Sequence, residues 1–147
     1  MKSRIHVVTL AVDDLERSLA FYRALGFESS GIIGTEFIGD ASQPGGAAAM
    51  FELEDGLILS LYGRDDLAKD GAISAGPPSS GEFSLGHLVA TREEVDAVLA
   101  QAVAAGAEAT EEPHDRPWGI YSAYFRDPDG HLWEIIHNPA MLGEATS

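Results

Sequence analysis

The chain of 147 residues contains no cysteine, which excludes disulfides, a thiolate nucleophile and thiolate metal ligands. Basic residues are also scarce: 9 Lys and Arg stand against 24 Asp and Glu, and the formal net charge is -15. Because sequence-independent nucleic-acid binding requires cations that neutralise phosphates, this balance argues against a nucleic-acid partner. The excess of acidic residues weakly favours a neutral or cationic ligand, and it also keeps the protein surface solvated.

Long hydrophobic runs and familiar catalytic motifs are missing too. The apolar start, residues 1–12, is too short to span a bilayer, and Asp13 and Asp14 follow it at once. The sequence has no G-x-S-x-G elbow, P-loop, G-x-G-x-x-G or H-E-x-x-H motif. We therefore expect a cytoplasmic protein with no membrane partner and no covalent catalysis.

What the chain does contain is an internal repeat. Gly26 and Gly106 each follow an apolar helical pattern and are 80 residues apart (106 minus 26), so this alignment matches Val7 with His87. Residues 51–61 (FELEDGLILSL) align with residues 125–135 (FRDPDGHLWEI) at an offset of 74 (129 minus 55), which matches Ser60 with Glu134. One half thus carries the two coordinating residue types, and the other half carries valine and serine.

Each half is predicted to form one strand, one helix and about three further strands. Asp13 with Glu16 is expected to cap the first helix, and Thr91 with Glu94 the second, while Gly26 and Gly106 end them. Alternation and turn residues predict strands at 5–12, 27–33, 35–38, 47–53, 56–62, 82–90, 107–110, 122–126 and 132–137. Residues 64–81 lack a sustained period and are interpreted as a linker with one short helical turn at 65–69.

This repeat, the opening residues 12–22 (VDDLERSLAFY) and the closing residues 126–134 (RDPDGHLWE) resemble the vicinal oxygen chelate superfamily. That superfamily includes glyoxalase I, bleomycin-resistance proteins, fosfomycin-resistance enzymes and extradiol dioxygenases. The resemblance implies an α+β fold in which tandem βαβββ modules, residues 4–63 and 82–139, form a half-open mixed-sheet cup within a single domain spanning 1–147. It also implies a homodimer, because the family commonly builds its cups at subunit interfaces.

In the family, residues on the first and last strands of the modules typically hold a divalent ion, and these positions map onto Val7, Ser60, His87 and Glu134. The internal alignment finds the same four positions. His87 and Glu134 could bind Mn, Zn, Ni or Fe if both face the cup. Val7 offers no donor and Ser60 only a hydroxyl, while His6 lies one residue out of phase. We therefore favour no metal, with His87 and Glu134 as a hydrogen-bonded pair.

Residues 114–125 form the densest aromatic stretch and resemble a wall of the family's ligand cavity. Trp118 and Tyr121 are expected to stack on a planar or apolar ligand, and Arg116 to pair with an anionic group. Tyr124 fits either the cavity or the sheet core. The first half contributes Ser60, Tyr62 and Met50, which share one phase of strand alternation.

The preferred hypothesis is a protein that binds a small organic molecule, with lyase-like or isomerase-like activity. Glu134 would act as general base on a C–H next to a carbonyl, and His87 would hold the substrate oxygen. Two alternatives stay open: a divalent-metal-dependent lyase, isomerase or dioxygenase, and a non-enzymatic, drug-sequestering binder.

Overall fold

The computed structural model describes residues 1–79 and 81–141, and the chain divides into two compact units, Met1–Pro78 and Ser79–Ser147. Both units are α+β, and each contains a β-α-β-β-β succession, as predicted. Within the described residues, no helix is both long and apolar enough to cross a membrane.

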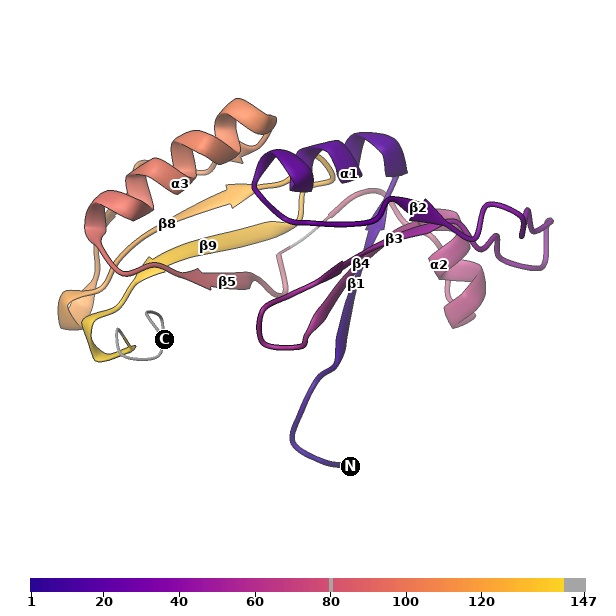
Figure 1. Cartoon of the computed structure of the whole chain (residues 1–147), viewed down its shortest axis with the longest axis horizontal. Helices are drawn as coiled ribbons and strands as arrows, with labels where there is room; N and C mark the ends of the chain where they lie inside the picture. Colours follow the sequence, from indigo (N-terminus) through magenta and orange to yellow (C-terminus); the bar gives the residue numbers. More distant parts are fainter. Residues whose placement is uncertain (80, 142–147) are drawn as a thin grey trace. The chain divides into compact units, whose positions relative to one another are not determined.

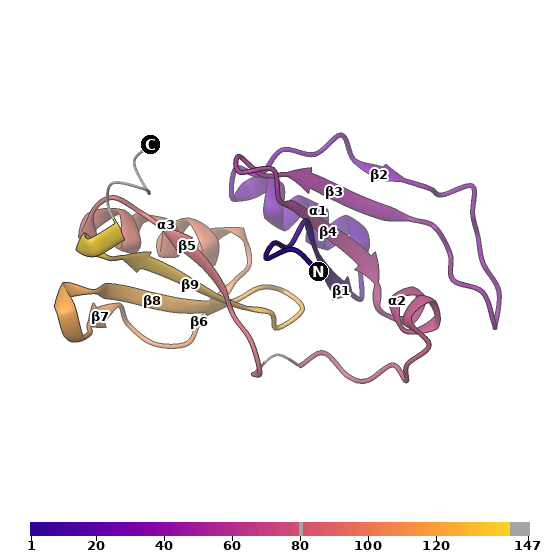
Figure 2. The same ribbon diagram turned by 90° about the horizontal axis from the view of Figure 1, so that it is seen from below.

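The first unit is a four-stranded mixed sheet in the order β1-β4-β3-β2 (Figure 2). β1 (Val7–Val12) pairs in parallel with β4 (Ile58–Gly63), and β3 (Ala48–Glu52) joins β4 to β2 (Ile32–Ile33) in antiparallel fashion. Helix α1 (Leu15–Ala24) follows β1, and α2 (Arg64–Gly71) follows β4. The helical turn expected near residues 65–69 is therefore part of a two-turn helix.

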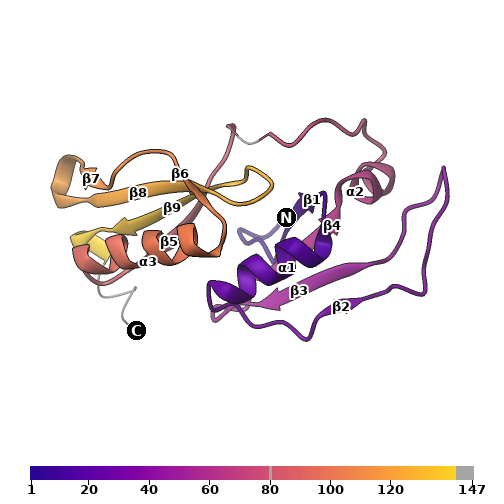
Figure 3. The same cartoon turned by 90° about the horizontal axis from the view of Figure 1, so that it is seen from above.

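Helix α1 covers one face of this sheet (Figure 3). Strand alternation turns Leu10, Leu59 and Leu61 toward it, and each is at most 2% exposed. On the helix, Tyr22 is fully buried and its ring centre lies 5.9 Å from that of Phe51. The opposite face carries the other phase of β1, β3 and β4, including Ser60 and Met50.

The second unit has the strand order β5-β9-β8-β6, with β7 pairing with β8. β5 (Leu85–Leu88) is parallel to β9 (Leu132–His137), which is antiparallel to β8 (Tyr121–Arg126). Two short strands, β6 (Glu108–Ala109) and β7 (His114–Asp115), pair with β8, and two 3-10 turns, η1 (Pro117–Gly119) and η2 (Pro139–Met141), lie near the ends of β8 and β9.

Helix α3 (Arg92–Ala105) lies along one face of β8 and β9 (Figure 1). Phe125 and Trp133 stack beneath it with ring centres 6.2 Å apart, and Ile135 is completely buried. Burial of these apolar side chains beneath α3 stabilises the packing of the helix on the sheet. The face away from α3 carries the second phase of β8 and β9.

Two sequence predictions in the first unit are wrong. The cap of α1 is Asp14, not Asp13: its carboxylate accepts from the Arg17 amide at 3.0 Å. Residues 35–38 form a loop instead of a strand, because the Phe37 carbonyl accepts from the Gly46 amide and the Phe37 amide bonds back to Gly34. These bonds close a turn in which Gly34 has a φ of 75°, a conformation that suits glycine.

The alignment that matches Val7 with His87, at an offset of 80 residues, is also wrong. The helix caps Asp14 and Thr91 are 77 residues apart (91 minus 14), not 80. Sheet register agrees, because Ser60 pairs with Thr9 and its counterpart Glu134 pairs with Gly86, again 77 residues on from Thr9 (86 minus 9). Helix α3 is longer than α1, so aligning the helix ends displaced the strands. The counterpart of Val7 is therefore Ser84, not His87.

Candidate functional site

The face of the second sheet away from α3 carries a Tyr–Glu pair at its centre. Tyr124 on β8 and Glu134 on β9 are direct cross-strand neighbours, and both side chains are half-buried. Burial, and secondly hydrogen bonding toward the Glu134 carboxylate, raises the pKa of Tyr124 above its ordinary value. The pair can therefore present a neutral phenol and a carboxylate acceptor to one small molecule.

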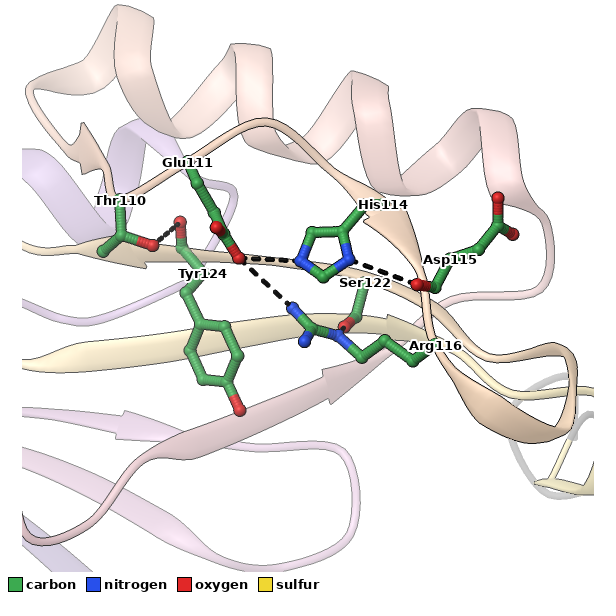
Figure 4. A network of polar contacts seen from close by, with 7 residues as sticks. All are labelled: Thr110, Glu111, His114, Asp115, Arg116, Ser122 and Tyr124. Atoms are coloured by element: carbon green, nitrogen blue, oxygen red, sulfur yellow. Dashed lines mark hydrogen bonds and ion pairs between the residues drawn. The ribbon is translucent and has the colours of Figure 1, made fainter.

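Arg116 lies beside Tyr124 on the same face (Figure 4). Its guanidinium carbon is 5.6 Å from the centre of the Tyr124 ring, within the range of a cation–π contact. The Nε group donates to the hydroxyl of Ser122, a completely buried residue two positions before Tyr124. Ser122 thus orients the guanidinium, and the segment before β8 supplies a positive charge next to the Tyr–Glu pair.

A second carboxylate, Glu111, lies next to this arginine (Figure 4). Its Oε1 is 2.7 Å from His114 Nε2 and 3.8 Å from Arg116 Nη2. The bond to Glu111, and then the contact of Nδ1 with the Asp115 carbonyl, raises the pKa of His114. Sequence reasoning did not pair His114 with a ligand-like partner, although the i,i+3 spacing from Glu111 was the available signal.

An open pocket of about 410 Å³ adjoins this face, and Tyr124 forms part of its wall. The pocket mixes hydroxyls, charged groups and apolar side chains; its lining residues are Gly81, Glu82, Phe83, Ser84, Thr110, Tyr124, Arg126 and Leu132. Most of these residues were missed by sequence reasoning. For Ser84 the missed signal was the spacing of the two helix caps, which identifies it as the counterpart of Val7.

His87 does not share the face of Glu134. In the parallel pairing of β5 with β9, Gly86 is level with Glu134 and His87 is level with Ile135. Side chains that are level across paired strands point to the same face, so His87 belongs to the face that α3 covers, at the edge of the sheet, where it is exposed. The prediction that His87 and Glu134 converge as a metal-binding or catalytic pair is thus corrected by the register.

The two aromatic residues predicted to stack on a ligand lie apart from Tyr124. Tyr121 occupies the opposite phase of β8: its hydroxyl donates to Asp96 of α3 at 2.8 Å, and the Arg92 guanidinium stacks 4.1 Å from its ring centre. Tyr121 therefore joins β8 to α3 and does not line the open face. Trp118 lies in η1 with 89% of its surface exposed and a positive φ of 62°, and its role as a ligand contact stays a prediction.

In the first unit, the register brings Ser60 and Met50 together. They are direct cross-strand neighbours on the face away from α1, with Ser60 buried and Met50 exposed. Tyr62 shares their phase, and its hydroxyl donates to the Gly45 carbonyl at 2.5 Å. Burial, followed by the nearby Asp66, raises the pKa of Tyr62. This hydrogen bond connects β4 to the loop that precedes β3.

The family's divalent ion does not fit the donors that either unit offers. Among the residues described, no three His, Asp or Glu side chains gather closely enough to hold a metal ion. Val7 has no donor atom, Ser60 and Ser84 offer hydroxyls, and His87 is turned to the other face. Glu134 is then the one strong ligand at these positions, whereas catalytic zinc sites use about three protein ligands.

Comparisons with known proteins place this geometry in a family. The family model described as Glyoxalase/Bleomycin resistance protein/Dioxygenase superfamily matches residues 4–135. A search of curated proteins found no match. Among solved structures, a glyoxalase-related enzyme from Fulvimarina pelagi is 27% identical with a TM-score of 0.75, over 94% of this chain and 90% of that one.

Two further structures share the fold. A lactoylglutathione lyase from Agrobacterium tumefaciens is 24% identical with a TM-score of 0.62, over 93% of this chain and 95% of that one. The fosfomycin resistance protein FosX from Listeria monocytogenes, complexed with Mn(II) and a dihydroxypropylphosphonic acid, is 22% identical with a TM-score of 0.66, over 97% of this chain and 95% of that one. The family model spans nearly the whole chain, and the chain therefore belongs to the glyoxalase/bleomycin resistance protein/dioxygenase superfamily, the vicinal oxygen chelate superfamily.

Proposed function

We propose that this protein binds a small organic molecule on the open face of its second sheet, at Tyr124 and Glu134. The observation that carries the proposal is the cross-strand pairing of these two half-buried side chains on the sheet face that α3 leaves uncovered. Both residues are half-buried, which leaves them accessible to a ligand while limiting competition from water. The adjoining pocket of about 410 Å³ supports the proposal, since it gives the rest of the molecule a place to lie.

The chemistry that suits this pair is proton transfer. Glu134 would take a proton from a carbon next to a carbonyl, and the electron pair of that C–H bond would pass into the carbonyl oxygen as an enolate. Return of the proton to another carbon would give an isomerase-like reaction, and loss of a neighbouring leaving group a lyase-like one. His87 has no part in this step because it belongs to the other face. The proposal needs no metal, in keeping with the donor set.

The test is an NMR fragment screen on the isotope-labelled protein, followed by two variants. Fragments are expected to shift the amide resonances of β8 and β9, and Tyr124→Phe and Glu134→Gln are expected to weaken their binding. Tyr121→Phe is the matched control, since this tyrosine lies on the same strand but bonds to α3. Fragments that bind all four proteins equally, or that leave β8 and β9 unshifted, would refute the proposal.

Turnover separates the enzyme from a pure binder. Deuterium uptake by a bound carbonyl fragment in heavy water, lost in Glu134→Gln, would identify proton abstraction. Binding without exchange would identify a sequestering protein. Exchange that depends on added Mn(II) or Zn(II) would favour a metal-dependent enzyme. Assembly as a homodimer and a cytoplasmic location also stay proposals, from the family resemblance and the composition respectively.

A further inference from the structure

Two opposite charges flank the ring of Tyr124. Glu134 is its direct cross-strand neighbour, and the Arg116 guanidinium carbon lies 5.6 Å from its ring centre. Both charged side chains are partly exposed, with 28% of the Arg116 side chain accessible. A ligand that rests against Tyr124 therefore meets a carboxylate and a guanidinium.

Both charged groups keep unused hydrogen-bonding capacity. A guanidinium carries five N–H donors, and within the described residues Arg116 uses only Nε, toward Ser122. Its Nη2 is buried without a hydrogen-bond acceptor, since Glu111 stands 3.8 Å away, and no described residue accepts from Nη1. A carboxylate can accept about four hydrogen bonds, and among the described residues Tyr124 is the one placed to donate to Glu134.

We propose that this site selects dipolar ligands: molecules in which an ammonium or other strong donor sits next to a carboxylate, as in an α-amino acid. The donor would bond to Glu134, and the oxyanion would bond to Nη1 of Arg116. This inference rests on the proposed function, because it assigns a ligand class to the same face.

The charge balance favours a dipole over a simple ion. A lone anion would meet Arg116 but also Glu111 and Glu134, in a chain whose net charge is -15. A lone cation would gain Glu134 but would meet the guanidinium of Arg116. A zwitterion places each of its charges against the opposite one, and its apolar substituent can lie against Leu132 in the adjoining pocket.

The experiment compares three probes that share one ring: phenylglycine, phenylacetate, which lacks the ammonium, and benzylamine, which lacks the carboxylate. Binding is followed by the shifts of the β8 and β9 amides and of the Arg116 Nε–H resonance. Phenylglycine is expected to bind about tenfold more tightly than either partial probe, the ratio that one charge-assisted hydrogen bond provides. The wild-type spectrum serves as the check that each variant is folded.

Two variants test which charged side chain recognises which charged group of the ligand. Arg116→Gln is expected to abolish the advantage of phenylglycine over benzylamine, and Glu134→Gln its advantage over phenylacetate. Arg92→Gln is the matched control, because this arginine stacks on Tyr121 on the α3 side, and it should leave both ratios unchanged.

Two results would overturn the inference while leaving the proposed function intact. The first is equal affinity of the three probes with shifts still confined to the face of Tyr124 and Glu134. The second is a preference for phenylglycine over benzylamine that survives in Arg116→Gln. A face that responds neither to these probes nor to any fragment would instead refute the proposed function.

Discussion

Replacing Tyr124 by Phe and Glu134 by Ala, singly and together, measures the interaction between the two cross-strand neighbours on which the candidate site depends. Hydrogen bonds to charged acceptors contribute about 1.5–3 kcal/mol when well buried. Because both side chains are only half-buried, solvent screening reduces this to roughly 1 kcal/mol. We therefore expect a coupling energy of about 1 kcal/mol between the two substitutions in the free energy of unfolding.

The assay is urea unfolding of the four proteins, followed by circular dichroism and tryptophan fluorescence. Tyr121→Phe combined with Glu134→Ala provides a matched cycle on the same strand. The Tyr121 hydroxyl bonds to Asp96 of α3, so its coupling to Glu134 should be close to zero. This comparison separates a specific bond from the general effect of removing a phenol from β8.

The reasoning would be refuted by equal coupling energies in the two cycles. A coupling near zero for Tyr124 with Glu134 would mean that the pair is not joined in solution. A large coupling for Tyr121 with Glu134 would mean that the face assignment of β8 is wrong. Either outcome would remove the physical basis of the proposed ligand site.

Three further perturbations follow from the same geometry. Glu111→Gln should lower the raised pKa of His114. The stability that the wild-type pair contributes is present below pH 6.5 and is lost as the pH rises through the folded-state pKa of His114. An NMR titration of His114 that gives the same pKa in both proteins would contradict this. Trp118→Gly should stabilise the protein by about 1 kcal/mol, because glycine adopts the positive φ without strain and the exposed Trp118 side chain loses little packing. A lower melting temperature of the variant would argue against backbone strain at this position. Thr91→Ala should cost about 1 kcal/mol through loss of the α3 cap, whereas Thr91→Ser should restore most of it in the same unfolding assay.

Local chemistry explains which features could be predicted from sequence. The cap at Thr91 and the helix ends at Gly26 and Gly106 depend on residues that are neighbours in the chain, so composition and spacing suffice. The alternation of β8 and β9 likewise predicts that Glu134 and Trp133 face opposite sides. The fold class follows from these local patterns and from the repeat, and the family match agrees with it.

Pairing between distant strands lies beyond such patterns. Nothing local fixes whether Gly86 or His87 stands level with Glu134, since a shift of one residue turns each side chain to the other face. That register buries Val89 and Ile135, two residues far apart in the chain. In the same way, Tyr121 and Tyr124 look equivalent as aromatic residues in one strand, and only the position of α3 separates them.

The sequence by itself therefore determined the elements, the duplicated plan and the position of Glu134 on the last strand. Only the tertiary structure decided Glu134's neighbour, replacing His87 by Tyr124, whose ring lies next to Arg116. The physical reason is that secondary structure is set by interactions over a few residues, whereas the make-up of a site is set by register and by which face a helix covers.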